Sequence, residues 1–313
     1  METIRLSYPD GLPSSGEPVS LAIGFFDGVH RGHQAVIAEA IRLGEELGAV
    51  PAVMTFDPHP RQVLGKEQIH RFLTPLPEKL GQFRRLGVKR AYVMRFDPVL
   101  AGLDKKRFVD GVLVPLGVRA VVTGFNFAFG RGAEGKAADL PELAEGRFVT
   151  RVIAPIESGG VPVSSTRLRK ALSEGDMEIA RDILGRFYSL EGTVVPGDRR
   201  GRQLGFPTAN LEPDEPYLLP KRGVYVVRVT DADGLAEHGV MNIGIRPTIH
   251  DPEPKERLEV HVLGFSGDLY GRVLRVEFLH FLREERKFSS LEELAEQIRR
   301  DRDQAESWLA RVE

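Results

Sequence analysis

The sequence predicts a doubly wound parallel α/β sheet, followed by a mostly antiparallel β-sheet or small β-barrel with one C-terminal helix. In the first half, short apolar runs without strict alternation take turns with amphipathic segments, which is typical of parallel strands buried on both faces. In the second half, partly alternating runs are separated by turn signals, with no long helix before Ser290. We expect the domain boundary near Gly185, which gives domains of residues 1–185 and 186–313.

Each expected element has a local signal. Thr74 followed by Pro75 predicts an N-cap with proline in the first helical turn. Ser290 and Glu293 form a capping box ahead of the final helix. The expected helices before it are 32–47, 74–86, 104–116, 167–172 and 176–184, and the expected strands are 19–26, 50–56, 90–96, 119–124, 148–155, 188–195, 223–230, 238–244, 258–264 and 272–280.

Composition narrows the class of protein. The chain has 313 residues, of which 42% are hydrophobic and 28% charged, as in soluble globular proteins with ample cores. Its 43 basic and 45 acidic residues give a charge of -2, which favours neither nucleic acid nor an anionic membrane as partner. Without cysteine there can be no disulfide, thiolate zinc site or cysteine nucleophile. Residues 1–9 lack a signal-peptide core and no apolar run approaches membrane-spanning length, so we expect a cytoplasmic protein.

The first strand runs into a segment that contains two histidines framed by glycines. Two glycines of this segment allow the backbone to approach a ligand, and the following helix offers free N–H groups and a positive dipole end. His30 and His33 lie three residues apart at the start of that helix, so both can donate to one anion. A plain βα turn with surface histidines is the alternative, but the position directly after an apolar strand favours a nucleotide phosphate site.

Two more segments follow strands at the same predicted edge of the sheet. Prolines flank His59 after the second strand, so this loop is either a structural corner or a ligand contact. Asn126 follows the fourth strand between Phe125 and Phe127, whose rings either join the core or form a wall for an aromatic ligand.

A helix opening at Ser164 carries hydroxyl groups at its free N–H groups and Arg169 shortly after them. Hydroxyls there are common as plain caps, but an arginine can also neutralise a leaving phosphate. A separate pattern, Gly130-x-Gly132-x-x-Gly135, satisfies the dinucleotide fingerprint and would suggest an NAD-dependent oxidoreductase. Since its first glycine lies six positions after the strand end at Gly124, and not directly at it, this hypothesis is the weaker one.

The second half carries its own polar constellation. Gly201 and Gly205 belong to a polar loop that is flexible enough to close over phosphates. Thr208 and Asn210, two residues apart, either form a turn or share one face of an extended segment as oxygen ligands for Mg²⁺. Glu259 lies in an apolar strand, where an unpaired carboxylate is costly, so it faces either solvent or a polar site.

Several of these strings resemble known signatures. Residues 30–33 resemble the His-x-Gly-His signature of the nucleotidylyltransferase superfamily, and residues 164–169 its Ser-Ser-Thr-x-x-Arg signature. Residues 205–210 resemble the Gly-x-Pro-Thr-Ala-Asn signature of riboflavin kinases. Taken in order, the motifs resemble the bacterial bifunctional riboflavin kinase/FAD synthetase family over nearly the whole chain.

The resemblance implies two reactions. A C-terminal riboflavin kinase domain would phosphorylate riboflavin with ATP and Mg²⁺, and an N-terminal nucleotidylyltransferase-type domain would transfer AMP from ATP to FMN, giving FAD and pyrophosphate. Alternatives are a protein that retains one activity and only binds ligand at the other site, or a flavin-binding or RNA-binding regulator without chemistry. The residues assigned on this basis are His30, His33, Arg169 and the general base Glu259 as catalytic; Gly24, Phe26, Asp27, Gly28, Gly32, Asn126, Ser164, Ser165, Thr166, Gly201 and Gly205 for ATP and its phosphates; Phe56, Pro58, His59, Phe125 and Phe127 for flavin; and Thr208 and Asn210 for Mg²⁺.

Overall fold

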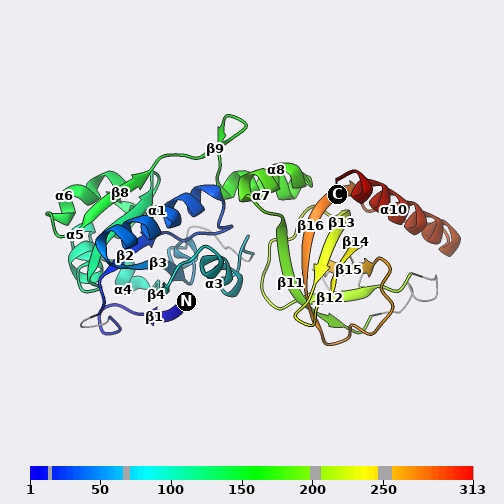
Figure 1. The fold of residues 1–313 in the computed structure, drawn as a ribbon, viewed down its shortest axis with the longest axis horizontal. Helices are drawn as coiled ribbons and strands as arrows, with labels where there is room; N and C mark the ends of the chain where they lie inside the picture. Colours follow the sequence, from blue (N-terminus) through cyan, green and yellow to red (C-terminus); the bar gives the residue numbers. More distant parts are fainter. Residues whose placement is uncertain (13–15, 66–70, 198–205, 246–255, 313) are drawn as a thin grey trace. The chain divides into compact units, whose positions relative to one another are not determined.

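The computed structural model describes residues 1–12, 16–65, 71–197, 206–245 and 256–312. The chain divides into two compact units, residues 1–165 and residues 166–313. The first unit is built on a parallel sheet and the second on a closed antiparallel barrel followed by a long helix (Figure 1). The predicted fold class is therefore confirmed.

The sheet of the first unit has six parallel strands in the order β1-β4-β3-β2-β5-β8. The central strand β2 is buried along its whole length, which explains its unbroken apolar run. The strand order reverses at β2, between β3 and β5, and ligands of open α/β sheets bind beyond the carboxyl ends of the strands at such a point. The strands are β1 Glu2–Leu6, β2 Val19–Ile23, β3 Val50–Asp57, β4 Arg90–Arg95, β5 Val118–Gly124 and β8 Val149–Ile153; the edge strand β1 was not predicted.

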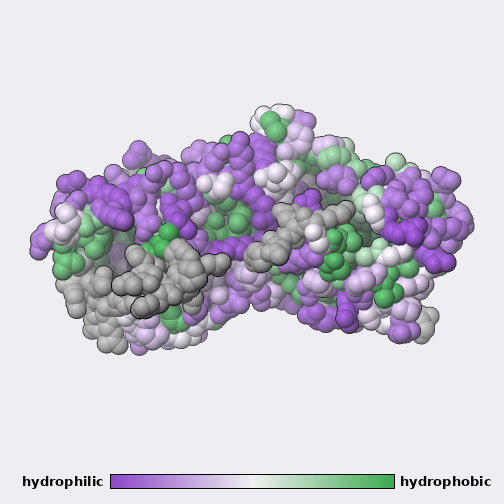
Figure 2. Space-filling view, turned by 180° about the vertical axis from the view of Figure 1, so that it is seen from behind, coloured by the Kyte–Doolittle hydropathy of each residue, from purple (hydrophilic) through white to green (hydrophobic). Residues whose placement is uncertain are grey.

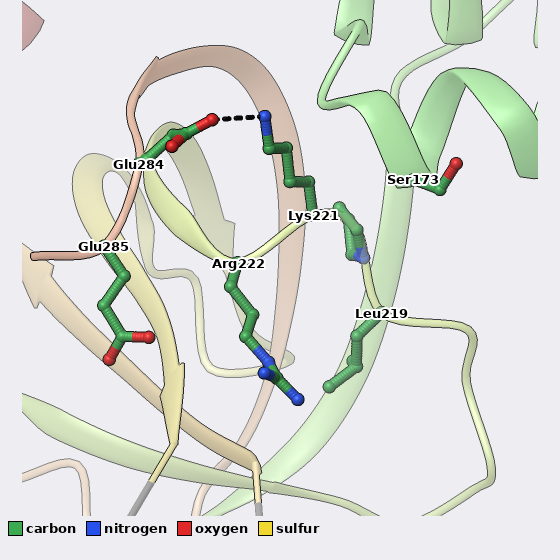
Figure 3. A pocket seen from close by; sticks show the side chains of 7 residues that line it. Ser173, Leu219, Lys221, Arg222, Glu284 and Glu285 are labelled. Atoms are coloured by element: carbon green, nitrogen blue, oxygen red, sulfur yellow. Dashed lines mark hydrogen bonds and ion pairs between the residues drawn. The ribbon is translucent and has the colours of Figure 1, made fainter.

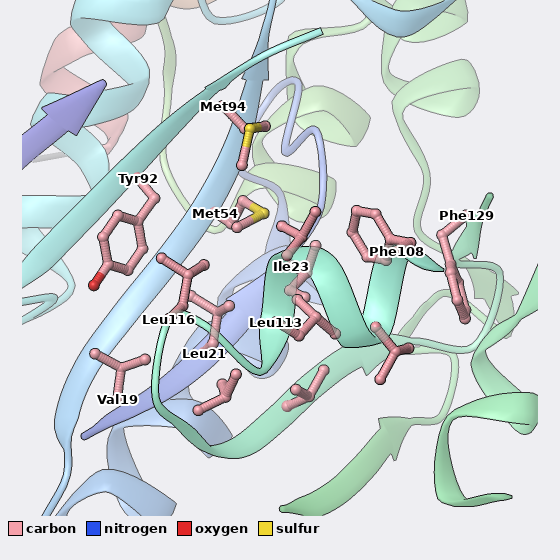
Figure 4. Close-up of a cluster of buried hydrophobic side chains, with 14 of the residues drawn as sticks. Val19, Leu21, Ile23, Met54, Tyr92, Met94, Phe108, Leu113, Leu116 and Phe129 are labelled. Carbon is pink, nitrogen blue, oxygen red and sulfur yellow. The ribbon is translucent and has the colours of Figure 1, made fainter. Parts of the chain in front are cut away.

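Each face of this sheet has its own apolar core. Alternate residues of β2 divide between them: Leu21 and Ile23 join the cluster drawn in Figure 4, together with Met54 and Met94, while Ala22 joins the other cluster. That second cluster includes the buried side of α1 (Arg31–Leu47), whose predicted bounds are confirmed to within one residue. The sheet is thus covered on both sides, as its apolar composition requires.

The other helices of this unit show where local signals were incomplete. The prediction that Thr74 caps a helix is wrong: α3 (Leu76–Arg85) begins after Pro75, and the Thr74 N–H donates to Asp27 instead. The helix expected over 104–116 is α5 (Lys105–Phe108), which continues into a π-helical turn. The remaining short elements are α2 Pro60–Val63, α4 Pro98–Ala101, β6 Ala128–Phe129, β7 Gly135–Lys136, α6 Leu140–Ala144, β9 Glu157–Ser158 and β10 Val161–Pro162.

The barrel of the second unit closes in the order β11-β12-β15-β14-β13-β16, with antiparallel neighbours throughout. Five of these strands were predicted; β12 was not. At the start of the final helix, Glu293 N–H donates to Ser290 Oγ as predicted, whereas the Glu293 carboxylate accepts from Ser289. The elements are α7 Ser165–Glu174, α8 Met177–Leu184, β11 Tyr188–Val195, β12 Ala209–Pro213, β13 Gly223–Thr230, β14 Ala236–Ile245, β15 Glu256–Val262, β16 Val273–Arg283 and α10 Leu291–Val312.

The surface is largely polar. Figure 2 shows hydrophilic residues over much of the visible face, interrupted by small hydrophobic patches. Within the described ranges, every helix is too short or too polar to cross a membrane.

Candidate functional site

The loop between β2 and α1 leaves the sheet at the point where the strand order reverses. Phe26, Gly28 and Val29 have φ angles of +59°, +89° and +42°. A left-handed conformation costs a residue with a side chain about 1–2 kcal/mol, so such a loop persists only where neighbouring groups fix it. Two glycines make room for its rings: a Cβ on Gly24 would come 2.9 Å from the Phe26 ring, and one on Gly32 would come 3.2 Å from the His30 ring.

Polar contacts from distant segments fix this loop. Asp27 is 6% exposed, and its Oδ1 accepts a hydrogen bond from Thr74 N–H at 3.1 Å. The Asp27 carbonyl accepts from Ser165 Oγ at 2.8 Å, and the Val29 carbonyl accepts from Gln34 Nε2 at 2.9 Å. Asp27 and Ser165, both predicted to contact phosphate, therefore bind each other and shape the loop.

The two histidines lie together at the helix N-terminus. His30 is the N-cap of α1, and its Nδ1 accepts from the backbone N–H of His33 at 3.3 Å. The two rings stack with centroids 3.6 Å apart and planes 18° apart, and the His33 ring also meets the edge of Phe26 at 5.3 Å. Because the Nδ1 of His30 accepts, a neutral His30 carries its proton on Nε2, where it can donate to a ligand. The predicted pairing of these imidazoles is thus present, although each ring also contacts protein.

Phe25, which follows β2, belongs to a group of three aromatic rings. Phe25, His59 and Phe72 have ring centroids 3.9 to 6.4 Å apart. His59 Nδ1 accepts from Arg61 N–H at 3.0 Å, which caps α2, so His59 does form a structural corner. Phe72 belongs to no sequence motif, so its place in this aromatic group was not predicted from the sequence.

The other residues predicted to bind flavin or ATP after the strands lie in different surroundings. Phe56 is 8% exposed and packs in the core, whereas Pro58 is exposed. In the turn after β5, Phe125 is 52% exposed, Asn126 is exposed and Phe127 is half-buried. An exposed ring beside an exposed amide suits ligand contact better than a core residue does.

Lys79 on α3 is a second residue that sequence reasoning missed. It is 2% exposed, and its Nζ donates to the Phe25 carbonyl at 2.8 Å and to Thr55 Oγ1 at 3.5 Å. The same Nζ lies 3.7 Å from the centroid of the Phe25 ring. Burial lowers the pKa of Lys79 to about 8, against the attraction of Asp27 and Asp57. Its position four residues before the buried Phe83 was the available signal, because it places Lys79 on the apolar face of α3.

The remaining N-terminal predictions have simpler outcomes. Ser164 directly precedes α7, and Thr166 and Arg169 lie in its first turns, within the second unit. Of the fingerprint glycines, Gly130 and Gly132 lie in a short turn between β6 and β7 with φ of +75° and +65°, and Gly135 begins β7. This turn contacts Lys105 and Phe129 and does not begin an α-helix, so it lacks the context that a dinucleotide site requires.

In the barrel, three polar side chains meet on neighbouring strands. Asn210 of β12 pairs with Glu259 of β15 in the strand register. Arg257 donates from Nε to Asn210 Oδ1 at 3.0 Å and forms an ion pair with Glu259 at 3.0 Å. The side chains of Arg257 and Glu259 are 26% and 25% exposed. Glu259 therefore faces a polar cluster, which settles the choice that the sequence left open.

The segment before β12 is held beside this cluster. His261 Nδ1 donates to the Pro207 carbonyl at 2.8 Å, and its ring meets the edge of Phe206 at 5.7 Å. Thr208 lines a surface pocket of about 570 Å³ together with residues of the turn that follows β15, including Asp268. Gly201 and Gly205, predicted to bind phosphate, lie outside the described residues.

The donor set near Asn210 fits a magnesium ion. Hydroxyl and amide oxygens are hard ligands, and Mg²⁺ commonly takes few protein ligands and completes its shell with phosphate oxygens and water. Gly197 provides space for the amide, since a Cβ there would come 1.9 Å from Asn210 Nδ2. Arg257, however, already donates to Asn210 Oδ1, so an ion bound at that oxygen would compete with the guanidinium.

A second pocket in the same unit has a different character. It has a volume of about 480 Å³ and is lined by residues of α7, of the segment before β13 and of the segment after β16, including Lys221, Arg222, Glu284 and Glu285 (Figure 3). Lys221 and Glu284 form an ion pair at 2.6 Å, shown by the dashed line. Since its two basic residues face two acidic ones, this pocket offers no net positive charge for a polyphosphate.

Two family models match this chain, one described as FAD synthetase over residues 12–167 and one described as riboflavin kinase over residues 184–309. Among curated relatives named bifunctional riboflavin kinase/FMN adenylyltransferase, that of Bacillus subtilis (strain 168) is 38% identical over 308 residues and covers 97% of both chains. That of Listeria monocytogenes is 40% identical over 295 residues, covering 94% of this chain and 93% of the relative. A crystal structure from Streptococcus pneumoniae, titled a macrolide-efflux protein, is 28% identical, covers 98% of this chain and all of its own, and has a TM-score of 0.89.

Proposed function

The chain belongs to the bifunctional riboflavin kinase/FMN adenylyltransferase family, and from this premise we propose which of its residues carry out the two reactions. It is a transferase that phosphorylates riboflavin to FMN and adenylylates FMN to FAD, with ATP as the second substrate of both steps. We propose residues 1–185 as the adenylyltransferase domain and 186–313 as the kinase domain, because Gly185 ends α8 in the left-handed region shortly before β11. We also propose that it works in the cytoplasm, since a chain without cysteine suits a reducing compartment.

For adenylyl transfer, His30 and His33 bind the triphosphate of ATP and stabilise the charge that develops on it. The observation that carries this assignment is the stacked pair of imidazoles at the N-terminus of α1, where free N–H groups and the helix dipole also favour an anion. An oxygen of the FMN phosphate attacks the α-phosphorus, and pyrophosphate leaves. Ser165 keeps the loop in shape through its hydrogen bond to the Asp27 carbonyl.

For the flavin ring, His59 and Phe125 are the residues best placed to make contact. Both follow strands of the first unit, Phe125 is largely exposed, and His59 contacts Phe25. Aromatic rings of this kind offer large flat surfaces for stacking. Phe56 belongs to the apolar core of the same unit.

For riboflavin phosphorylation, Glu259 is the general base. It takes the proton of the terminal ribityl hydroxyl, whose oxygen then attacks the γ-phosphorus of ATP while ADP leaves. Its place in a polar cluster with Asn210 supports this role. Thr208 and Asn210 would hold a magnesium ion, which when bound neutralises charge on the phosphates. Arg257 keeps the Glu259 carboxylate in place.

Two substitutions in the same chain test these roles. The purified protein is mixed with riboflavin, ATP and magnesium, and FMN and FAD are separated by chromatography. We expect His33→Ala to abolish FAD formation but spare FMN formation, and Glu259→Gln to abolish FMN formation but spare conversion of supplied FMN. Matched controls are His238→Ala and the exposed Glu237→Gln, both on β14. If either test variant lost both FMN and FAD formation, or retained both, the assignment of separate sites would be wrong.

A further inference from the structure

We propose that Lys79 is a positioning residue for adenylyl transfer, whose charged amine holds the Phe25 carbonyl and ring and, through them, the loop that binds phosphate. This inference rests on the proposed function of His30 and His33. Lys79 lies on α3, well apart in sequence from β2 and α1, and no motif includes it.

The contacts of Lys79 converge on one peptide unit. Its Nζ donates to the Phe25 carbonyl at 2.8 Å, and that carbonyl also accepts from Thr55 Oγ1 at 2.9 Å. The next residue, Phe26, has a positive φ and meets the ring of His33 edge-on at 5.3 Å. A shift of the Phe25 carbonyl would therefore move Phe26 and with it the packing of His33.

The ring of Phe25 adds a second restraint. The ammonium lies 3.7 Å from its centroid, and a buried cation at this distance is strongly attracted to an aromatic face. The same ring lies 3.9 Å from the ring of His59, which follows β3. Lys79 thus also positions the aromatic group beside the loop.

Burying a charged lysine in this space costs the folded state free energy. Lys79 is 2% exposed, and among the residues that the structure describes its ammonium has two hydrogen bonds and the Phe25 ring as partners. The charged and titratable groups that face it are Asp27 from the loop, Asp57 from the end of β3 and, across the Phe25 ring, His59. A methionine would fill nearly the same volume without the cost, so packing alone does not explain a cation here.

The charge of Lys79 is lost within an accessible pH range. Burial lowers its pKa to about 8. Above that pH the neutral amine still donates to the Phe25 carbonyl, but it loses the charge-assisted part of this bond and its attraction to the ring. A positioning role for the charge therefore makes adenylyl transfer pH-dependent, whereas a packing role does not.

The test compares Lys79→Met with the wild type and with Lys89→Met, the same change at an exposed lysine. FAD formation from FMN is measured from pH 7 to 9.5, with riboflavin phosphorylation by the same preparation as internal control. We expect Lys79→Met to lower kcat/KM for FAD formation about tenfold or more at pH 7, from loss of the charge-assisted contact. Riboflavin phosphorylation and Lys89→Met should be unaffected, and the ratio of wild-type to Lys79→Met activity should shrink above pH 8.

Three results would overturn the inference: undiminished FAD formation in Lys79→Met, a ratio that stays constant with pH, or an N-terminal unit that fails to fold without the charge. His33→Ala is assayed alongside. If His33→Ala abolishes FAD formation while Lys79→Met does not, the inference fails and the proposed function stands. If His33→Ala has no effect, the proposed function itself fails.

Discussion

Replacing Lys79 by methionine should make the N-terminal unit more stable while impairing its chemistry. Burial takes the pKa of Lys79 from its ordinary value of 10.5 to about 8. At about 1.4 kcal/mol for each pKa unit, the charged form costs the folded state about 3 kcal/mol at neutral pH. Lys79→Met removes this cost and loses the hydrogen bond to the Phe25 carbonyl, worth about 1 kcal/mol, and the longer, weaker one to Thr55 Oγ1 at 3.5 Å, while the Phe25 carbonyl keeps its bond from Thr55. The net expectation is a gain of about 2 kcal/mol.

The gain should depend on pH in a defined direction. Below pH 8 the lysine is protonated in both the folded and the unfolded state, and the full penalty applies. Between pH 8 and 10.5 the folded state releases this proton while the unfolded state keeps it, so the wild-type free energy of unfolding rises with pH. Lys79→Met has no such group, so its advantage is largest below pH 8 and declines above it.

Urea unfolding of the full chain, followed by two signals at pH 7 and 9.5, measures this effect. Far-UV circular dichroism reports both units, whereas the single tryptophan, Trp308, lies on α10 and stacks on His280, so its fluorescence reports the second unit alone. We expect the circular dichroism transition of the first unit to move to higher urea in Lys79→Met, with the Trp308 transition and Lys89→Met unchanged. A less stable first unit, or an equal difference at both pH values, would refute the reasoning.

Three further substitutions have expected outcomes in the second unit. Arg257→Ala removes a cation from Asn210, so it should lower the free magnesium concentration needed for half-maximal FMN formation about threefold to tenfold. If the variant needed more magnesium than the wild type, Arg257 would assist the ion and the reasoning would be wrong. Gly223→Ala should destabilise the barrel by about 2 kcal/mol, measured by urea unfolding followed by Trp308 fluorescence. The reason is that the alanine Cβ would come 2.3 Å from the Arg283 carbonyl oxygen, at a position whose φ is +149°. An unchanged urea midpoint would contradict this. Asp301→Asn should lower the free energy of unfolding of the second unit by about 2–4 kcal/mol in the same assay, because the Asp301 side chain is 4% exposed and binds Arg283 through both oxygens. A loss no larger than that of the surface variant Asp303→Asn would count against this.

Local sequence patterns predicted the elements whose own residues show the apolar spacing of a buried strand or helix. The run of β2 is apolar because both faces are buried, and α1 shows its buried side at helical spacing, so both were found. Strand β12 was missed because only five residues form it, and they include Asn210, Glu212 and Pro213. Its pairing with β11 and β15 makes it a strand, and such partners cannot be read from a short polar segment.

Side-chain contacts were predicted where neighbours in sequence determine them. His30 and His33 meet because helical spacing brings them together. Whether Glu259 faces solvent or a polar site depended on Arg257 and on Asn210, which lies on another strand. Lys79 escaped notice because its partners, Phe25 and Thr55, lie on other elements. Contacts between distant segments are therefore the part of the site that periodicity and motifs leave undetermined.

The two candidate sites depend on the fold in different ways. The loop between β2 and α1 has positive φ angles and is fixed by Thr74, Lys79 and Ser165, which lie outside it. Substitutions in α3 or at the start of α7 should thus impair FAD formation without touching substrate. The kinase cluster is fixed by the strand register that pairs Asn210 with Glu259, which the whole barrel maintains. FMN formation should therefore be insensitive to distant substitutions until the barrel itself unfolds.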